Sequence, residues 1–483
     1  MNKKILTTIP LSFAIAAGAQ GATTDQLEST VNEMQKTIEN LQQQILEMKK
    51  QQQVAPPPTN SMMLTTNPTM TVSPDKVVFS QTVTQINGHQ AQVSSRDTFN
   101  DQQEAAPRAN DLTLDPQYRG FIPIPNTPAM IKFNAKPRVD FTSDSGNTGN
   151  PDRFVTAQIP VDGQSNQGGG RQFNVNARGS SLRLDVRAPN FAGDPRFYYE
   201  NDFFGSGGGM AYRVKQLWGQ YYNVTAGWTY SIFEDPDAWP DTVDFEGPNS
   251  MIFARQPTLR YLLPVNEHWQ FNFGIQQPSS DIDNFDLADV SSVNHAPDGG
   301  MNVRWEDKKI GHLQVAGIFR DVGANSPTFG NQHSFGWGLM AATSLNVFGK
   351  DSMQLQATYG EGYFHFANDN FTYSGFNGGD AAYDKNGNLK PLPFFSAMAG
   401  YTHHWTDSFR STATFGWADL DNSFSQGPLA YHRTLYASGN VVYQIRKRLS
   451  VGLEALYGKK EDKSGAEGDV FRVQLGIVWA LFD

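Results

Sequence analysis

The sequence predicts an all-β transmembrane barrel of about 16 antiparallel strands, preceded by an N-terminal α-helical coiled coil. Three observations support this fold class. Apolar and polar residues alternate from about residue 130 to the end of the chain. Short and long connections alternate between these runs. Near the N-terminus, apolar residues instead recur at steps of four and three, which is the spacing of a coiled-coil seam.

Residues 1–21 predict a signal peptide. Lys3 and Lys4 precede the apolar run 5–17, and the small residues Ala17, Gly18 and Ala19 form a cleavage site. We therefore expect the chain to be exported from the cytoplasm.

Residues 22–52 predict the coiled coil. Its seam consists of Leu27, Val31, Met34, Ile38, Leu41, Ile45 and Met48. About three heptads are marginal on their own, so we expect a homo-oligomer that is also held together elsewhere, with a trimer favoured over a dimer. A single amphipathic helix that lies on a neighbouring element is the alternative. Pro56, Pro57 and Pro58 end this helix, and residues 53–129 form a linker rich in Pro, Gln and Thr.

Residues 130–483 predict the barrel. Trp269, Phe271, Phe273 and Ile275 alternate with Gln270, Asn272, Gly274 and Gln276, and the last run places Phe471, Val473 and Leu475 opposite Arg472 and Gln474. One apolar and one polar side is typical of a wall between lipid and water. Short connections such as 348–351 and 405–408 alternate with long ones such as 230–256 and 361–393. A soluble β-sandwich or propeller is the alternative, but the apolar faces of so many strands would then need a second sheet to cover them.

The polar side of the predicted strands is basic. If apolar residues face lipid, their neighbours line the lumen, and these include Arg138, Arg183, Arg213, Lys215, Arg260 and Arg304. A basic lumen favours anions, and the planar guanidinium can donate two hydrogen bonds to one carboxylate. We therefore predict that these residues contact anions. The alternative is that they pair with lumen carboxylates and only brace the wall.

The connection 230–256 is unusually acidic. It carries Glu234, Asp235, Asp237, Asp241 and Asp244. We hypothesise that it folds into the lumen as a constriction loop, where it would face the basic wall across a transverse field. A calcium-binding loop outside the barrel is the alternative.

Several function classes are excluded or disfavoured. The chain has no cysteine, which excludes disulfides and thiolate chemistry. A net charge of −10 disfavours nucleic-acid binding. HExxH, GxSxG and Walker A motifs are missing from the sequence, so we predict neither an enzyme nor a cofactor, and we predict no metal site.

Four sequence blocks resemble the DcaP-like outer-membrane channels. They span 196–205, 212–221, 240–245 and 255–261, and the layout of a coiled coil before a barrel is also similar. The resemblance implies a homotrimer of sixteen-stranded barrels in the outer membrane of a Gram-negative bacterium. Arg213, Lys215, Arg255 and Arg260 fall in the matching blocks and are predicted to contact anions. One departure is that Asp483 follows Phe482, whereas such barrels usually end in an aromatic residue.

These observations together predict a porin, embedded in outer-membrane lipid, for the passive uptake of small anionic solutes such as dicarboxylates. Its N-terminal segment would be periplasmic. Two alternatives remain open. One is a sugar-selective porin. The other is a structural envelope protein whose coiled coil tethers the outer membrane to peptidoglycan.

Overall fold

The computed structural model describes Lys36 and residues 98–108, 120–189, 191–283, 290–370 and 379–481. Apart from Lys36, the predicted signal peptide and coiled coil lie outside the described residues. All the other described residues belong to one unit, residues 86–483. Within this described part, helices are too short or too polar to cross a membrane.

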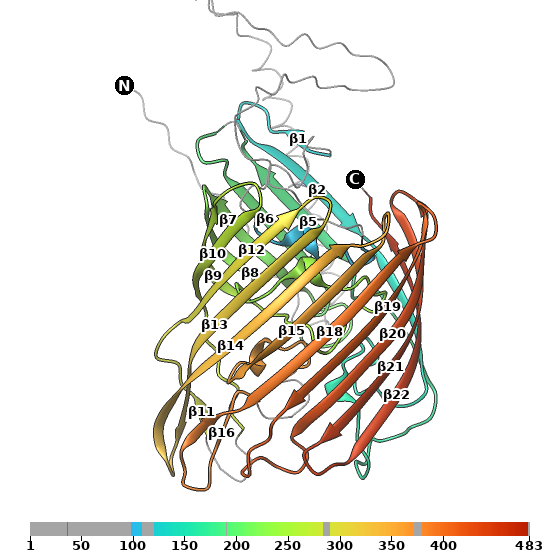
Figure 1. Ribbon diagram of the computed structural model, residues 1–483. Coiled ribbons are helices and arrows are strands. Elements are labelled where there is room, and N and C mark those ends of the chain that lie inside the picture. Colours follow the sequence, from blue (N-terminus) through green and yellow to red (C-terminus); the bar gives the residue numbers. More distant parts are fainter. Residues whose placement is uncertain are drawn as a thin grey trace, which may run out of the picture. The chain divides into compact units, whose positions relative to one another are not determined.

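Most of the described chain is β-strand (Figure 1). The strands are β1 (Ile122–Pro123), β2 (Met130–Lys136), β3 (Arg138–Asp144), β4 (Gln172–Asn176), β5 (Ser181–Arg187), β6 (Arg196–Asp202), β7 (Arg213–Tyr221), β8 (Val224–Tyr230), β9 (Arg255–Pro264), β10 (Trp269–Gln276), β11 (Ser291–Ser292), β12 (Asp298–Asp307), β13 (Gly311–Ser326), β14 (Gly330–Asn346), β15 (Ser352–Glu361), β16 (Ala381–Tyr383), β17 (Leu389–Pro391), β18 (Pro393–His404), β19 (Phe409–Leu420), β20 (Tyr431–Arg446), β21 (Leu449–Asp462) and β22 (Glu467–Trp479). Twenty of them form one antiparallel sheet, and β16 and β17 form a separate pair.

The strand count differs from the predicted sixteen, because the structure divides two of the predicted runs and adds four short strands, which gives 22 strands in the described part of the chain. Pro137 separates β2 from β3, since proline has no N–H to donate to a ladder. A turn at 177–180 separates β4 from β5. The two-residue strands β1 and β11 and the pair β16–β17 lie within segments predicted as connections. Consecutive long strands pair along the chain, and β22 pairs with β3.

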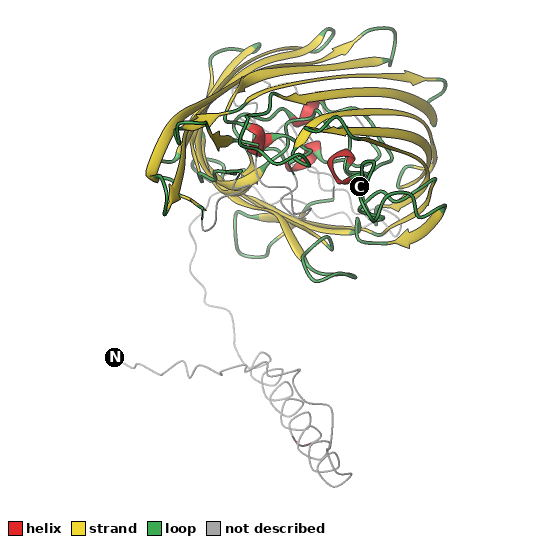
Figure 2. Cartoon of the chain, turned by 90° about the horizontal axis from the view of Figure 1, so that it is seen from below, coloured by secondary structure: helices red, strands yellow, loops and turns green. Residues whose placement is uncertain are grey.

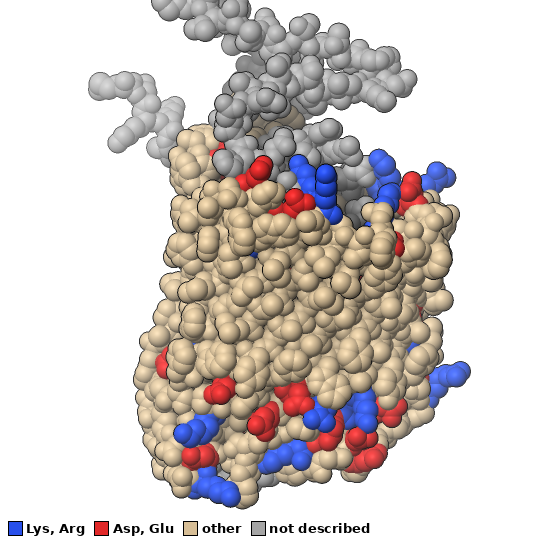
Figure 3. Space-filling model, viewed as in Figure 1, with Lys and Arg blue, Asp and Glu red and all other residues tan. Residues whose placement is uncertain are grey.

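The predicted alternation is confirmed. Phe471 on β22 exposes 47% of its surface, whereas Arg472 beside it exposes 0%. Trp269, Phe271, Phe273 and Ile275 on β10 are likewise exposed, while Asn272 and Gln276 are buried. On the face shown in Figure 3, Lys, Arg, Asp and Glu gather at the two rims and leave a band with few charges between them. This outer face is the one that meets hydrocarbon.

The buried residues lie on the inner side of the sheet. Figure 2 shows the strands around an interior that holds loops and short helical segments. The 3₁₀ helices are η1 (Gln103–Ala105), η3 (Thr156–Gln158), η4 (Pro236–Ala238) and η5 (Phe364–Phe366). The core of this unit is therefore made of inward segments packed against the lumen side of the strands, as the clusters around Phe233 and around Trp239 show.

Candidate pore constriction

The loop 231–254, between β8 and β9, is almost entirely buried. Its apolar side chains Ile232, Phe233 and Val243 are fully buried, and burial of such residues stabilises the folded loop. The Phe233 ring meets that of Phe366 edge-on, at 6.0 Å between centroids. The backbone N–H of Phe253 donates to the carbonyl oxygen of Phe366 at 2.9 Å. The loop therefore rests on a second inward segment, which contains η5.

The wall makes room for the loop. Gly416 on β19 faces the lumen, and a Cβ atom there would lie 2.3 Å from Oδ1 of Asn249 and 2.6 Å from Oγ of Ser250. Contacts that short do not occur in folded proteins, so any side chain at 416 would push the loop away from the wall. Asn249 also donates to Oγ1 of Thr434 on β20 at 2.7 Å. The wall and the loop are therefore fitted to each other.

Three of the predicted loop carboxylates bind cationic side chains of the wall. Asp235 accepts from Arg304 at 3.1 Å and lies 2.8 Å from Nε2 of His312. Asp237 accepts from Arg304 at 2.9 Å. Asp241 accepts from Nε of Arg410 on β19 at 2.6 Å. The acidic loop and the basic wall thus meet in direct contact at these points, rather than across an open gap.

The other two predicted loop carboxylates, Glu234 and Asp244, are bound mainly by backbone. Glu234 accepts from the N–H groups of Ser231 and Ala254, at 3.2 and 3.1 Å, and burial raises its pKa well above the ordinary value. Asp244 accepts from the N–H of Gly247 at 3.0 Å, and burial raises its pKa to about 7. By contrast, Arg108 and Arg304 outweigh the effect of burial on Asp237 and hold its pKa below the ordinary value.

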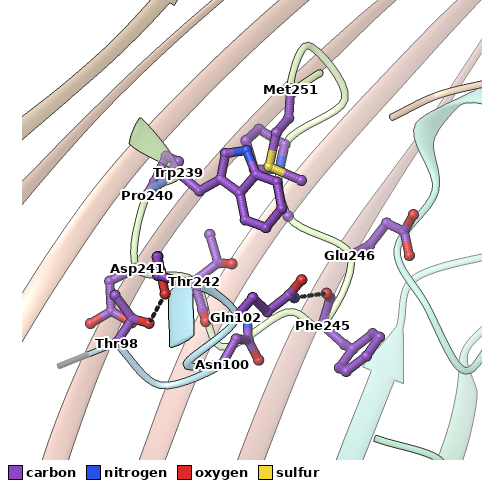
Figure 4. Close-up of a pocket in the computed structure, with 13 residues that line it drawn as sticks. Thr98, Asn100, Gln102, Trp239, Pro240, Asp241, Thr242, Phe245, Glu246 and Met251 are labelled. Carbon is purple, nitrogen blue, oxygen red and sulfur yellow. Dashed lines mark hydrogen bonds between the residues drawn. The ribbon is translucent and has the colours of Figure 1, made fainter. Parts of the chain in front are cut away.

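A segment N-terminal to the wall strands, residues 98–108, packs against this loop. The backbone N–H of Phe99 donates to Oδ1 of Asp241 at 2.7 Å. The Asn100 side-chain amide donates to the carbonyl oxygens of Thr242 and Asp244 at 2.9 and 2.8 Å. Figure 4 shows Thr98, Asn100 and Gln102 on one side of a small pocket, with loop residues on the other side. The segment and the loop together fill part of the lumen.

The same segment also brings carboxylates to the basic wall. Nη1 of Arg183 on β5 donates to Asp101 at 2.9 Å and to Glu104 at 2.5 Å. Lys136 on β2 forms an ion pair with Asp101 as well. Arg138 on β3 contacts the side chain of Asn100. Asp101 and Glu104 therefore neutralise cations of the wall, among them Arg183, which is predicted to contact solutes.

Most of the predicted anion-contact residues pair with carboxylates. Arg138 binds Asp140, Arg183 binds Asp101, Glu104 and Glu200, Arg213 binds Asp202, Lys215 binds Glu200, and Arg304 binds Asp235, Asp237 and Glu306. Arg255 and Arg260 form no ion pair with any residue in the described part of the chain. Arg255 lies over the rings of Tyr230 and Phe253, 5.7 and 4.6 Å from their centroids, and Arg260 donates to the carbonyl oxygen of Tyr230.

Two parts of the site, the segment 98–108 and Arg410, are not among the residues predicted from the sequence. Residues 98–108 fall within the predicted linker and have no strand or helix periodicity. The only signal there was the pair of acidic residues, Asp101 and Glu104, in a stretch rich in Gln and Ala. Arg410 could have been found, because it shares the polar side of its run with Thr412 and Thr414.

An antiparallel wall with an apolar outer face and a charged interior that is crossed by loops defines an outer-membrane channel. The family model for the DcaP outer membrane protein matches residues 62–479. The chain therefore belongs to the DcaP outer membrane protein family, whose place is the outer membrane of Gram-negative bacteria.

Solved structures of bacterial outer-membrane proteins are similar to this chain, and the first of those named here shares its fold. The outer membrane channel DcaP of Acinetobacter baumannii is 19% identical with a TM-score of 0.64, over 73% of this chain and 97% of that chain. The anion-selective porin from Comamonas acidovorans is 12% identical with a TM-score of 0.48, over 73% of this chain and 100% of that chain. No curated protein sequence gives a significant match.

Proposed function

We propose that this channel prefers anions, that Arg255 contacts the solutes, and that Arg260, which is buried, adds its positive charge to the lumen. The single observation that carries the proposal is that these two wall arginines lack a carboxylate partner among the described residues, whereas the other five predicted contact residues have one. A paired guanidinium adds little net field at a distance, because its partner cancels most of its charge. An unpaired one keeps its charge and its donors for a solute.

The position of Arg255 suits a small carboxylate. Its guanidinium lies on two aromatic rings, which fixes the plane of the group by cation–π contact. The planar edge can then donate two parallel hydrogen bonds to one carboxylate. Small anions, dicarboxylates among them, are the solute class that this arrangement favours.

The loop 231–254 and the segment 98–108 would form the constriction on this path. Both are largely buried in the lumen. The loop forms ion pairs with β12 and β19, whereas the segment forms ion pairs with β2 and β5. We further propose a closed barrel of about 16 wall strands, since the pairing of β22 with β3 continues through the hydrogen bond from Leu481 N–H to the Ala135 carbonyl. We also propose that the protein is a homotrimer with a periplasmic coiled coil.

Aromatic side chains in the lumen argue against the sugar-selective alternative. Tyr198 and Trp218 stack at 5.6 Å and Tyr230 meets Trp239 edge-on at 5.5 Å, but all four are buried. Arg196 covers the Tyr198 and Trp218 rings at 5.2 and 4.9 Å. Rings that are covered in this way offer no face to a passing sugar.

The test is the reversal potential of the purified protein in a planar bilayer under a salt gradient. We expect the sign of the reversal potential to indicate that anions cross more readily than cations. A cation-selective reversal potential would refute the proposal. Deletion of residues 236–248 is the matched test of the constriction. It should raise single-channel conductance, and an unchanged conductance would remove the loop from the permeation path.

A further inference from the structure

Two histidines and one aspartate meet on the outer side of the wall at its rim, where the hairpin joins β13 and β14, away from the constriction. Asp321 lies on β13 and His333 on β14, near the hairpin that joins these strands. In the register of this pair, Asp321 is opposite Phe335 and Gly323 is opposite His333, so the side chains of Asp321 and His333 share one face. His295 reaches the same place from the segment after β11. One nitrogen or oxygen atom from each of the three lies within 4.8 Å of the others.

The three side chains are held by specific contacts. Nδ1 of His333 lies 3.0 Å from both carboxylate oxygens of Asp321. The backbone N–H of His295 donates to Oδ2 of Asp321 at 3.0 Å. The two imidazole rings stack with centroids 3.7 Å apart. The donor atoms are therefore brought together from three separate segments between residues 295 and 333.

The space for the His333 ring depends on Gly323. A Cβ atom at 323 would lie 2.5 Å from Nδ1 and Cε1 of His333, so any other residue would displace the ring. On its far side, Nε2 of His333 lies 3.0 Å from Oδ1 of Asn331. An imidazole that binds a metal through one nitrogen usually donates its other N–H to such an acceptor, which fixes the tautomer. Asn331 thus leaves Nδ1 of His333 as the nitrogen that faces Asp321.

We propose that His295, Asp321 and His333 bind one divalent transition-metal ion, of the Zn²⁺ or Cu²⁺ class. Two neutral imidazoles and one carboxylate are a donor set that these metals take readily. The side chains of Asp321 and His333 are about one quarter exposed, at 24% and 23%, so water can fill the remaining coordination positions.

A second cluster, Asp281, His365 and Asp380, fits a metal less well. Its ligand atoms are equally close, but Nη1 of Arg320 lies 2.9 Å from Oδ2 of Asp380. A guanidinium at that distance neutralises the carboxylate and repels a cation. No arginine or lysine forms an ion pair with Asp321 in the described part of the chain. The second cluster therefore serves as the internal comparison.

The test uses the full mature chain in detergent, without a histidine tag, titrated with Zn²⁺ by calorimetry. We expect one Zn²⁺ per chain, with affinity at least about tenfold weaker in His295→Gln and in His333→Gln. His365→Gln reports on the second cluster, and His268→Gln, a histidine beside Glu267 at a short turn, is the control. Both should bind like the wild type. Circular dichroism melting verifies that each variant is folded.

Electron paramagnetic resonance of bound Cu²⁺ provides an independent measurement. The wild type should give hyperfine coupling to two imidazole nitrogens, and each single variant, His295→Gln or His333→Gln, to one. The proposal is overturned if the wild type shows no saturable Zn²⁺ binding. It is also overturned if the variant that combines His295→Gln with His333→Gln binds Zn²⁺ as tightly as the wild type, or if only His365→Gln loses the ion. None of these results bears on the anion preference, which is measured separately in the bilayer.

Discussion

The Arg108 guanidinium donates to both carboxylate oxygens of Asp237, at 2.6 Å each. This two-point ion pair joins the segment 98–108 to the loop 231–254 across 129 positions of sequence. Bidentate pairs of this kind are the strong and geometrically specific ones. The pair therefore makes the segment and the loop one unit within the lumen, and this relationship leads to the first prediction.

Arg108→Gln should loosen the segment from the loop. The loss of a charge-assisted pair in a buried site costs about 1–3 kcal/mol, although Asp237 keeps Arg304. We expect higher single-channel conductance and more current noise as the segment moves, measured in planar bilayers. Arg178→Gln, which breaks a pair with Asp152 outside this unit, is the control and should leave conductance unchanged. Equal conductance in both variants would contradict a role for the segment in the constriction.

Asp101→Asn combined with Glu104→Gln should increase anion preference. These changes remove two negative charges that now pair with Arg183 and Lys136, so the wall cations gain net field toward solutes. The reversal potential under a salt gradient should shift further in the anion direction, and more at low ionic strength than at high, because salt screens the field. A shift toward cations, or none, would show that these charges lie off the permeation path.

Arg255→Gln should reduce anion preference more than Arg213→Gln does. Arg213 is neutralised by Asp202 at 2.6 Å, so it presents a smaller net charge to a solute than Arg255 does. Arg255 has no such partner among the described residues. Competition by a small dicarboxylate in the bilayer should weaken in Arg255→Gln by about tenfold, the effect of one charged hydrogen-bonded contact. Equal effects of the two substitutions would remove Arg255 from its proposed role.

The channel should lose anion preference as the pH rises from about 6 to 8. Burial raises the pKa of Asp244 from its ordinary 3.8 to about 7, so this carboxyl is neutral at pH 6 and charged at pH 8. Arg472, Glu246 and Glu454 surround it. Because its folded pKa is raised, the stability it contributes is present below about pH 4 and is lost as the pH passes 7.

Asp244→Asn should flatten this pH dependence of the reversal potential. Asp237→Asn is the matched control, because its carboxyl has a lowered pKa and stays charged over the whole range. That variant should shift the potential equally at every pH while keeping the slope. If the reversal potential of Asp244→Asn still changes with pH as it does in the wild type, a group other than Asp244 causes the pH dependence.

The strands could be predicted because their determinants are local. Phe471 and Arg472 differ in environment simply because successive side chains on a strand point to opposite faces. The break between β2 and β3 could also have been predicted, because Pro137 has no N–H to donate to the sheet. The acidic loop is buried, but its contacts with Arg304 and Arg410 depend on strand register and not on any spacing in the sequence.

The pairing state of each lumen cation could not be predicted. Arg183 and Arg255 look alike in sequence, yet Asp101 and Glu104 reach the first from a segment about eighty positions earlier, while the second lies on aromatic rings. His295, Asp321 and His333 likewise form no motif. The sequence alone determined a wall of strands with alternating apolar and polar faces, because this period acts within a few residues. The tertiary structure decided which charges remain unpaired, because an ion pair requires contact within about 4 Å between segments whose approach only the folded chain determines.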